Sequence, residues 1–273
     1  MEKVEYLLGH SKRELDRLQR QAEVGRPFTE HFLSEIGVGP GWKVLEIGCG
    51  AGDLAMRLGE LVGPSGFVIG VDRSADAIDI ARSRTRAAGL EQVSFQQSSA
   101  EEFTASMKFD LAIARLVLVH QKDPTAVVRA VAQVVRPGGT VAFYEPDLTR
   151  GAFRSSPYVP ILHKVADWMG RLFEKELPHH DVGTRLVEQF YRAGLPRPRL
   201  ISHAPVLTGD DLLRFQWLVD ILETLRPKLI REGIITEDEF PSEGLAEQLQ
   251  AAVLEAHSQV IFPSTFGVWA KII

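Results

Sequence analysis

Residues 44–52 carry the most informative pattern of the chain, Val44-Leu45-Glu46-Ile47-Gly48-Cys49-Gly50-Ala51-Gly52. The apolar beginning is typical of a buried strand, three alternate glycines follow, and a helical pattern starts near Asp53. Glycine permits a tight turn and brings bare backbone against a ligand. The helix N-terminus beyond it offers unpaired N–H groups and the positive end of a dipole. This order predicts a ligand-binding turn at the carboxyl edge of a sheet.

An acidic residue strengthens that interpretation. The next apolar run, Phe67–Val71, ends in Asp72, about 20 residues beyond the glycines. A carboxylate at the tip of that strand can accept hydrogen bonds from both hydroxyls of a ribose. A glycine turn alone could be merely a tight turn, whereas strand, glycines, helix and strand-end acid in this order favour a nucleoside site.

Apolar runs alternate with amphipathic helical patterns from Lys43 to Tyr144, as in β-α units around a parallel sheet. The expected strands are Lys43–Ile47, Phe67–Val71, Val93–Gln96, Phe109–Ala114 and Thr140–Tyr144. Ser74 and Asp123-Pro124 are expected to begin helices, and Arg136-Pro137-Gly138-Gly139 is expected to separate a helix from the next strand.

The pattern changes after Glu145. The expected elements are helices at His163–Phe173 and Val182–Ala193, a strand near Leu200–Val206, a helical stretch from Asp210 to His257 broken by Pro227 and Pro241, and a strand at Thr265–Lys271. We therefore expect a single domain with its core at about 36–150, 182–207 and 260–273, and a helical cap at about 1–35, 151–181 and 208–259.

The composition of the chain bounds its class. With 273 residues, 45% of them hydrophobic, the sequence is typical of a globular protein. A net charge of -5 disfavours nucleic acid as a partner. Cys49 is the single cysteine, and neither a signal peptide nor a membrane-spanning window is recognisable. We expect a cytoplasmic protein without membrane association; its oligomeric state stays open, with a homodimer as one alternative.

The run from Glu46 to Gly52 resembles motif I of class I, Rossmann-like methyltransferases that use S-adenosylmethionine. The similarity covers about Lys43 to Asp147. It includes Asp72 as the ribose-binding acid and three further segments: Ser98-Ser99-Ala100-Glu101-Glu102-Phe103, Phe109-Asp110-Leu111 through Arg115, Leu116 and His120, and Val135-Arg136-Pro137-Gly138-Gly139.

The resemblance implies a seven-stranded, mostly parallel sheet with an antiparallel last strand. It also implies S-adenosylmethionine along the carboxyl ends of the first strands, with S-adenosylhomocysteine as product. The residues it assigns to the cofactor are Glu46, Gly48, Cys49, Gly50, Gly52, Asp72, Arg73, Ser99, Ala100, Ala114 and Arg115. Ser99 departs from the family, which usually has an aspartate there, so adenine recognition would depend more on the Ala100 backbone N–H and on apolar packing.

Methyl transfer from a sulfonium is an in-line displacement, for which alignment of the reactants is the main requirement. A base is needed only if the acceptor loses a proton as it attacks, as a hydroxyl does. His120 and His180 are the candidates. Local packing is the alternative explanation for His120, and at most one of the adjacent His179 and His180 is expected to face the substrate. Adjacent histidines at His179-His180 lack the spacing of a metal-ligand pair, so we expect no metal.

The acceptor is expected to be an apolar or aromatic small molecule, of the kind modified in natural-product metabolism, by O-, N- or C-methylation. Tyr6, His163 and Trp168 are candidate wall residues of its pocket, although a helix that docks on the core explains their positions as well.

Three other functions compete with this interpretation. An NAD-dependent oxidoreductase would show a G-x-G-x-x-G spacing, which the glycines here do not follow. A methyltransferase for DNA, RNA or protein is disfavoured because Ala114-Arg115-Leu116-Val117 stands where a nucleobase-methylating loop would have an Asn/Asp-Pro-Pro-Tyr type sequence. A non-catalytic module that merely binds the cofactor would not need both the glycine loop and the acid for packing.

Overall fold

The structure is a computed structural model that describes residues 12–100, 102–240 and 244–273, with side chains from residue 24 onward. Two compact units make up this part of the chain. The sheet unit comprises residues 25–145, 182–202 and 266–273. The helical unit comprises residues 146–181 and 203–265, without 241–243, together with the preceding helical residues up to Val24.

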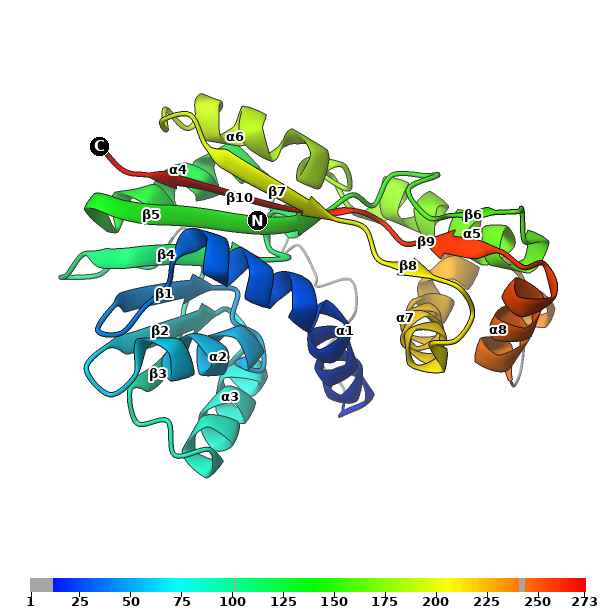
Figure 1. The fold of residues 1–273 in the computed structure, drawn as a ribbon, viewed down its shortest axis with the longest axis horizontal. Helices are drawn as coiled ribbons and strands as arrows, with labels where there is room; N and C mark the ends of the chain where they lie inside the picture. The colour runs from blue at the N-terminus through cyan, green and yellow to red at the C-terminus, as the bar shows by residue number, and fades with distance from the viewer. Residues whose placement is uncertain (1–11, 101, 241–243) are drawn as a thin grey trace. The chain divides into compact units, whose positions relative to one another are not determined.

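A seven-stranded sheet with the order β3-β2-β1-β4-β5-β10-β7 forms the centre of the sheet unit (Figure 1). Its strands are β1 (Lys43–Ile47), β2 (Phe67–Asp72), β3 (Val93–Gln97), β4 (Phe109–Arg115), β5 (Val135–Pro146), β7 (Arg199–His203) and β10 (Thr265–Lys271). The first five strands in this order, β3, β2, β1, β4 and β5, are parallel to one another. The end of β10 lies beside the start of β5, where Gly138 N–H donates to the Ile272 carbonyl at 2.7 Å, so β10 is antiparallel. The expected Rossmann-like methyltransferase fold is confirmed.

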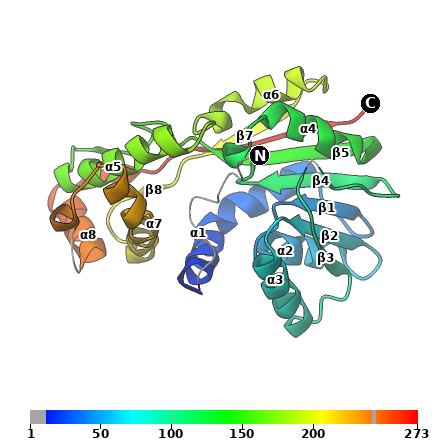
Figure 2. The same ribbon diagram turned by 180° about the vertical axis from the view of Figure 1, so that it is seen from behind.

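Helices cover both faces of this sheet (Figures 1 and 2). One face carries the part of α1 (Lys12–Ile36) that lies in the sheet unit, together with α2 (Asp53–Val62) and α3 (Ala75–Ala87). The other face carries α4 (Pro124–Gln133) and α6 (Leu186–Arg192), where Phe190 of α6 meets Phe143 of β5 edge to face. The central strands β1, β4 and β5 are therefore largely buried on both sides, whereas the edge strands are not: β3 exposes Ser94, Gln96 and Gln97, and most of β7 is exposed.

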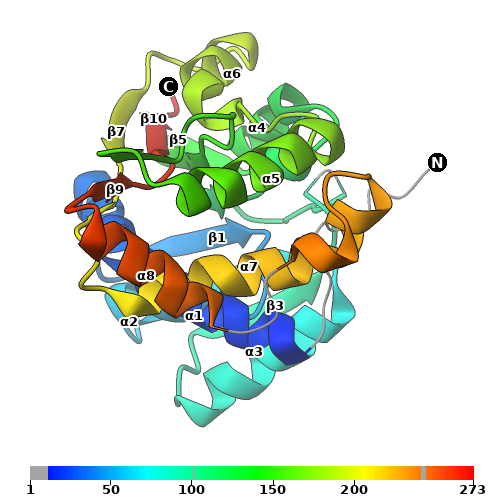
Figure 3. The same ribbon diagram turned by 90° about the vertical axis from the view of Figure 1, so that its right-hand side faces the viewer.

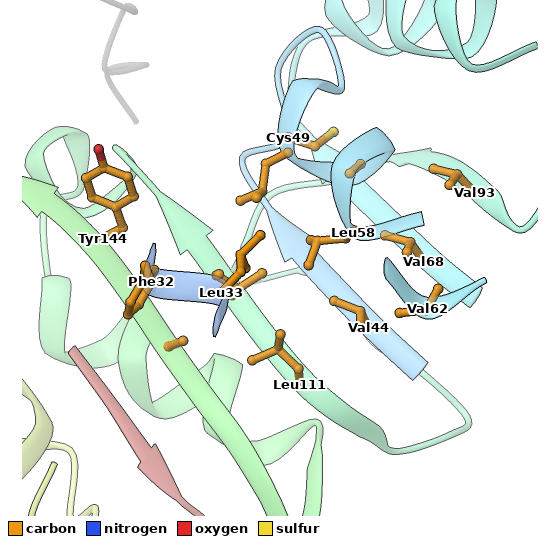
Figure 4. Close-up of a cluster of buried hydrophobic side chains, with 14 of the residues drawn as sticks. Phe32, Leu33, Val44, Cys49, Leu58, Val62, Val68, Val93, Leu111 and Tyr144 are labelled. Atoms are coloured by element: carbon orange, nitrogen blue, oxygen red, sulfur yellow. The ribbon is translucent and has the colours of Figure 1, made fainter. Parts of the chain in front are cut away.

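A cluster of buried apolar side chains joins the first face to its helices (Figure 4). Phe32 and Leu33 of α1 and Leu58 of α2 are almost fully buried against strand residues such as Val44 and Leu111. At roughly 25 cal/mol per Å² of buried apolar surface, such side chains each contribute about 1.5–3 kcal/mol. This packing fixes the strand ends from which the candidate site is built.

The expected boundaries of β1 to β4 are confirmed to within one residue, and so are the caps Ser74 and Asp123. The prediction for β5 was wrong at its start. Phe109 already pairs with Val135, and the pairing resumes at Leu111 with Thr140, so residues 136–139 form a bulge inside the strand. Proline and glycine interrupt the regular pairing there, but the strand continues beyond them.

Two further expectations need correction in the segments after residue 181. Val182–Arg185 is a 3-10 helix, η2, that precedes the short α6, so the expected single helix Val182–Ala193 is divided. The expected strand near Leu200–Val206 is two strands in different sheets: β7 belongs to the large sheet, and β8 (Val206–Leu207) to a small one. Ala204-Pro205 separates them, because proline has no N–H for a ladder.

Besides the beginning of α1, the described residues of the helical unit form three helices (Figure 3) and a small antiparallel sheet (Figure 1). The helices are α5 (Pro160–Glu176), α7 (Leu212–Arg231) and α8 (Leu245–Glu255), and the sheet has the order β6 (Arg154–Ser156), β9 (Gln259–Ile261), β8. A 3-10 helix, η3 (Glu237–Glu239), follows α7.

Pro227 does not break α7, contrary to expectation. A buried stripe runs past it on the same helix, consisting of Phe215, Leu218, Leu222, Leu225 and Leu229. Burial of this stripe outweighs the missing backbone N–H, which by itself disfavours proline in a helix. Pro241, the second expected break, lies outside the described residues.

None of the helices in the described part of the chain combines the length and apolar character that crossing a bilayer requires.

Candidate functional site

The carboxyl ends of five parallel strands meet at one edge of the sheet unit. Ile47 of β1 pairs with Val71 of β2 and Ala114 of β4, and Arg115 pairs with Tyr144 of β5. Asp72 pairs with Gln97 of β3. The glycine loop, Asp72 and the segments that follow β3 and β4 are therefore neighbours. In open α/β sheets ligands bind outside this edge.

The glycine loop turns away from β1 through left-handed backbone conformations. Gly48, Gly50 and Gly52 have φ values of 69°, 51° and 87°. The N–H groups of Gly48 and Cys49 donate to the carbonyl of Val71, at 2.7 and 3.0 Å, which holds the loop against the end of β2. Side chains at these glycines would be strained, because L-residues rarely adopt positive φ.

Gly48 and Gly50 differ in their surroundings. A Cβ atom on Gly48 would lie 2.3 Å from Cγ2 of Val117, so this glycine lets the segment after β4 pack against the loop. A Cβ atom on Gly50 would have no atom within 4 Å. The bare backbone at Gly50 therefore borders open space, as a ligand-binding loop requires.

Asp72 stands at the end of β2 and bonds to the glycine loop. Its Oδ2 accepts from Gly50 N–H and its Oδ1 from Ser74 N–H, both at 2.9 Å. An ionised carboxylate offers about four lone-pair sites, so two remain for further donors. Asp72 is only half-buried, which leaves it accessible to a ligand.

Glu46 is a buried acid beneath the loop, with 2% of its surface exposed. Burial raises its pKa to about 8, and the nearby Asp53 and Asp72 raise it as well; Arg115 and the Ala55 backbone amide lower it. Its Oε2 has no hydrogen-bond partner in the described residues. A buried polar atom without a partner is costly, so this oxygen is available to a donor or cation.

Two neighbours of the loop have structural roles. Arg84 of α3 donates to the Ala51 carbonyl and to Asp53 Oδ1, both at 2.7 Å, and so ties the loop and the start of α2 to α3. No sequence motif had pointed to this arginine. Cys49 is buried, and burial raises the pKa of its thiol, so it stays neutral and is a poor nucleophile.

The segment after β3 supplies the next group of candidates. Ser99 Oγ accepts from the Glu102 N–H at 3.2 Å, so this hydroxyl caps the turn and keeps its own proton for another partner. Ser98 N–H donates to the Asp72 carbonyl at 3.0 Å, which ties the segment to β2. Ala100 is half-buried and the side chain of Arg73 is exposed.

β4 ends with buried Ala114 and half-buried Arg115. Leu116 has a positive φ of 59°, and a short 3-10 helix, η1 (Leu118–His120), follows. His120 N–H donates to the Val117 carbonyl at 3.1 Å, and the residue is half-buried.

Glu145, at the end of β5, is an important residue that the sequence reasoning missed. It is completely buried, and its Oε1 accepts from the N–H groups of Val117 and Leu118, both at 2.8 Å. Burial raises its pKa to about 7, while the backbone amides of Leu118, Val117 and Val119 lower it. The available signal was an acid directly after a buried strand, the same signal that identified Asp72.

The remaining candidates belong to the helical unit. His180 Nδ1 lies 3.3 Å from the Leu177 carbonyl. His163 Nε2 lies 3.1 Å from Ser155 Oγ, and the ring of Tyr158 stacks on the imidazole. Trp168 is buried. Tyr6 lies outside the described residues.

His163 lines a surface cavity of about 560 Å³ within the helical unit. Its other lining residues mix aromatic, apolar and charged groups: Arg150, Gly151, Phe153, Tyr158, Pro160, Lys164, Ala166 and Asp167. Within the described part of the chain, no group of three or more His, Cys, Asp or Glu residues has the geometry to hold a metal ion.

The family of the chain follows from a direct match. The family model of a methyltransferase domain matches residues 39–192, which contain the glycine loop, Asp72 and the segments after β3 and β4. The chain belongs to this methyltransferase family.

Relatives of this chain agree with the family assignment. Methyltransferase GfsG of Streptomyces halstedii is 37% identical over 212 residues, which are 76% of this chain and 65% of GfsG. A demethylmenaquinone methyltransferase of Lactococcus lactis is 26% identical over 58% of this chain and 63% of its own length. The chain thus spans somewhat less than two thirds of these relatives.

A solved structure shares the fold. A putative methyltransferase of Bacillus halodurans superimposes with a TM-score of 0.59 at 15% identity, over 89% of this chain and 97% of the other. At that identity the similarity concerns the fold alone.

Proposed function

We propose that this methyltransferase-family chain transfers a methyl group from S-adenosylmethionine to a small-molecule acceptor. The observation that carries the proposal is the contact between the glycine loop and Asp72 at the end of β2: Gly50 presents bare backbone to open space, and its N–H donates to the Asp72 carboxylate. Family membership and the methyltransferase relatives support the same reaction.

The residues of the edge fit the chemistry of this cofactor. Asp72 keeps acceptor capacity for the ribose hydroxyls. Glu46 carries a buried oxygen without a partner, which suits the cationic methionine end of the ligand. Ala100 and Ser99 offer backbone and hydroxyl groups to the adenine, and Gly48, Gly52, Ala114, Cys49, Arg73 and Arg115 complete the proposed binding residues.

S-adenosylmethionine supplies a methyl group on a sulfonium, which already has a good leaving group. The protein then has to hold the two reactants in line and exclude water, and alignment can supply about 7–11 kcal/mol of the barrier. The fixed turn at residues 48–52 and the fixed segment after β4 serve this alignment, because both are held by backbone hydrogen bonds.

Binding titrations test the cofactor assignment. Calorimetry should show binding of S-adenosylmethionine and S-adenosylhomocysteine and none of NAD; binding of NAD alone would favour the oxidoreductase alternative. Asp72→Ala should weaken S-adenosylhomocysteine binding by about 1.5–3 kcal/mol, the scale of a hydrogen bond to a charged group. Asp76→Ala, which removes an exposed acid from the first turn of α3, is the control and should bind normally. Unchanged affinity in Asp72→Ala would exclude the ribose role.

For the acceptor we propose an apolar or aromatic small molecule, such as a quinol or another aromatic secondary metabolite. The L. lactis relative is named for an acceptor of this class. The cavity at His163 and Tyr158 presents aromatic surface and is a candidate for its binding. Lys164 of its lining lies over the ring of the buried Trp168, with Nζ 5.1 Å from the ring centroid. Methyl transfer from radiolabelled cofactor to a panel of quinols, phenols and amines would identify the acceptor class.

If the acceptor is a hydroxyl, we propose His120 as its base, with His180 as the alternative. His120→Gln should then lower kcat by about 10²–10⁴-fold, the usual contribution of general base catalysis, while the KM for the cofactor stays unchanged. The loss should diminish as the pH rises and the acceptor ionises by itself. The matched variant His180→Gln distinguishes the two histidines, and normal turnover in both would show that neither acts as a base.

A further inference from the structure

Glu145 has an unusual position for an acid. It is fully buried at the end of β5, and the groups that influence its pKa are its burial and three backbone amides rather than a cation. Its Oε2 is buried and has no partner in the described residues. Burying a carboxyl group in this way is costly, and an apolar residue of similar size would serve packing better.

The contacts of Glu145 concern one segment. Its Oε1 accepts from two successive backbone N–H groups, those of Val117 and Leu118, at 2.8 Å each. The preceding Leu116 is held in a left-handed conformation, and its N–H donates to the Tyr144 carbonyl at 2.9 Å. A left-handed backbone in a leucine is strained, and it persists only where the surroundings enforce it.

The segment in turn contacts the glycine loop. The Val117 side chain packs over the Cα of Gly48, at the place where a Cβ atom would lie only 2.3 Å from Val117 Cγ2. A continuous set of contacts thus leads from the Glu145 carboxylate through Val117 to the first glycine of the loop. On its other side, Leu118 begins the short helix that ends at His120.

We propose that Glu145 is a positioning residue of the methyl-transfer site. It fixes the segment Leu116–His120 through two backbone N–H groups, and this segment in turn packs against Gly48 of the glycine loop through Val117. This inference rests on the proposed function. Glu145 acts on the site through the N–H groups of Val117 and Leu118, which its Oε1 binds.

Two variants of Glu145 test the role. Glu145→Gln keeps an acceptor oxygen for the two N–H groups and should retain cofactor affinity and kcat within about threefold, less than the loss of one net hydrogen bond would cause. Glu145→Met keeps the volume but removes the acceptor. It should lower kcat by about 10- to 100-fold, the scale expected when reacting groups are misplaced, and weaken S-adenosylhomocysteine binding.

A measurement without catalysis separates positioning from general stability. In Glu145→Met, hydrogen exchange of the Val117 and Leu118 amides should accelerate in the unliganded protein, whereas the amides of β1 keep their protection. Glu145→Gln should leave both sets protected. Glu91→Met, which changes an exposed acid before β3, is the control and should resemble the wild type in every readout.

The outcomes distinguish this inference from the proposed function. A wild-type protein that fails to bind S-adenosylhomocysteine would contradict the proposed function. Normal wild-type binding, together with unchanged binding and turnover in a folded Glu145→Met, would contradict only the positioning role. If Glu145→Met does not fold, Val117→Ala replaces it: this variant keeps the Glu145 acceptor but shortens the side chain over Gly48, and unchanged cofactor affinity in it would overturn the inference.

Discussion

At the scale of single residues, the candidate site contains three acids that differ in burial and in hydrogen bonding. Asp72 is half-buried and satisfied by two backbone N–H groups, whereas Glu46 and Glu145 are buried with one oxygen each unpaired. Asp72 could be predicted because the acid follows the second strand of a recognisable β-α-β pattern. The role of Glu145 could not, since its partners Val117 and Leu118 are 28 and 27 residues away in the chain.

The raised pKa of Glu46 leads to a prediction about pH. The folded chain keeps this proton up to a pKa of about 8, whereas the unfolded chain releases it near 4.5, so the stability of the wild type should fall as the pH rises between these values. The decrease is on the order of 1.4 kcal/mol per pH unit at most. Glu46→Gln should remove this contribution to the pH dependence of stability. The smaller contribution of Glu145 remains in the variant and ends near pH 7. Urea unfolding at several pH values measures the difference, and equal slopes in both proteins would contradict it.

The same acid should respond to a cationic ligand. Bound positive charge favours the ionised form, so cofactor binding near pH 7 should release a proton from Glu46. Calorimetry in buffers of different ionisation enthalpy would detect this release, and Glu46→Gln should lack it. Arg115, Asp53 and Asp72 also act on Glu46, but they are present in both proteins and cancel in the comparison.

At the scale of the elements, the sequence was most informative where local signals and burial agree. The strands β1 to β4 combine apolar runs with clear ends, and Ser74 and Asp123 mark the beginnings of their helices. The failures occur where tertiary pairing overrides a local signal. Residues 136–139 have the sequence of a loop that precedes a strand, yet Val135 before them already pairs with Phe109. Similarly, α7 continues through Pro227 because its apolar stripe is buried.

The cap of α4 can be tested separately from the site. Asp123 Oδ1 accepts from the Ala126 N–H at 2.9 Å, and the following Pro124 begins the helix without needing a donor. Asp123→Ala should lower the free energy of unfolding by about 0.5–2 kcal/mol. Asp123→Asn keeps the cap and should cost much less, and neither variant should change cofactor affinity. Urea denaturation with a parallel binding titration checks both statements, and an alanine variant as stable as the wild type would show that the cap is unimportant.

At the scale of the whole molecule, the two units differ in how far the sequence explains them. The sheet unit contains every residue that we propose for the cofactor, and its motifs follow the strand order of the fold. The helical unit contains His163, His180 and Trp168 and no recognisable motif, so its aromatic and apolar residues predicted helices and an apolar or aromatic class of acceptor, but not which molecule it is. Its small sheet of β6, β9 and β8 was not foreseen, because strands of two or three residues leave too short a pattern to recognise.

This distribution predicts where cofactor binding protects the chain. Ligand that binds only the native state stabilises it by about 2.7 kcal/mol at a hundredfold excess over Kd. Hydrogen exchange with S-adenosylhomocysteine should show the strongest added protection at residues 48–52, 98–100 and 115–118 of the sheet unit. The helices α7 and α8 of the helical unit supply none of the proposed contacts and serve as the internal control. Protection confined to those helices, with none at the glycine loop, would place the ligand elsewhere, because an amide is shielded most where the ligand or the backbone it orders excludes water.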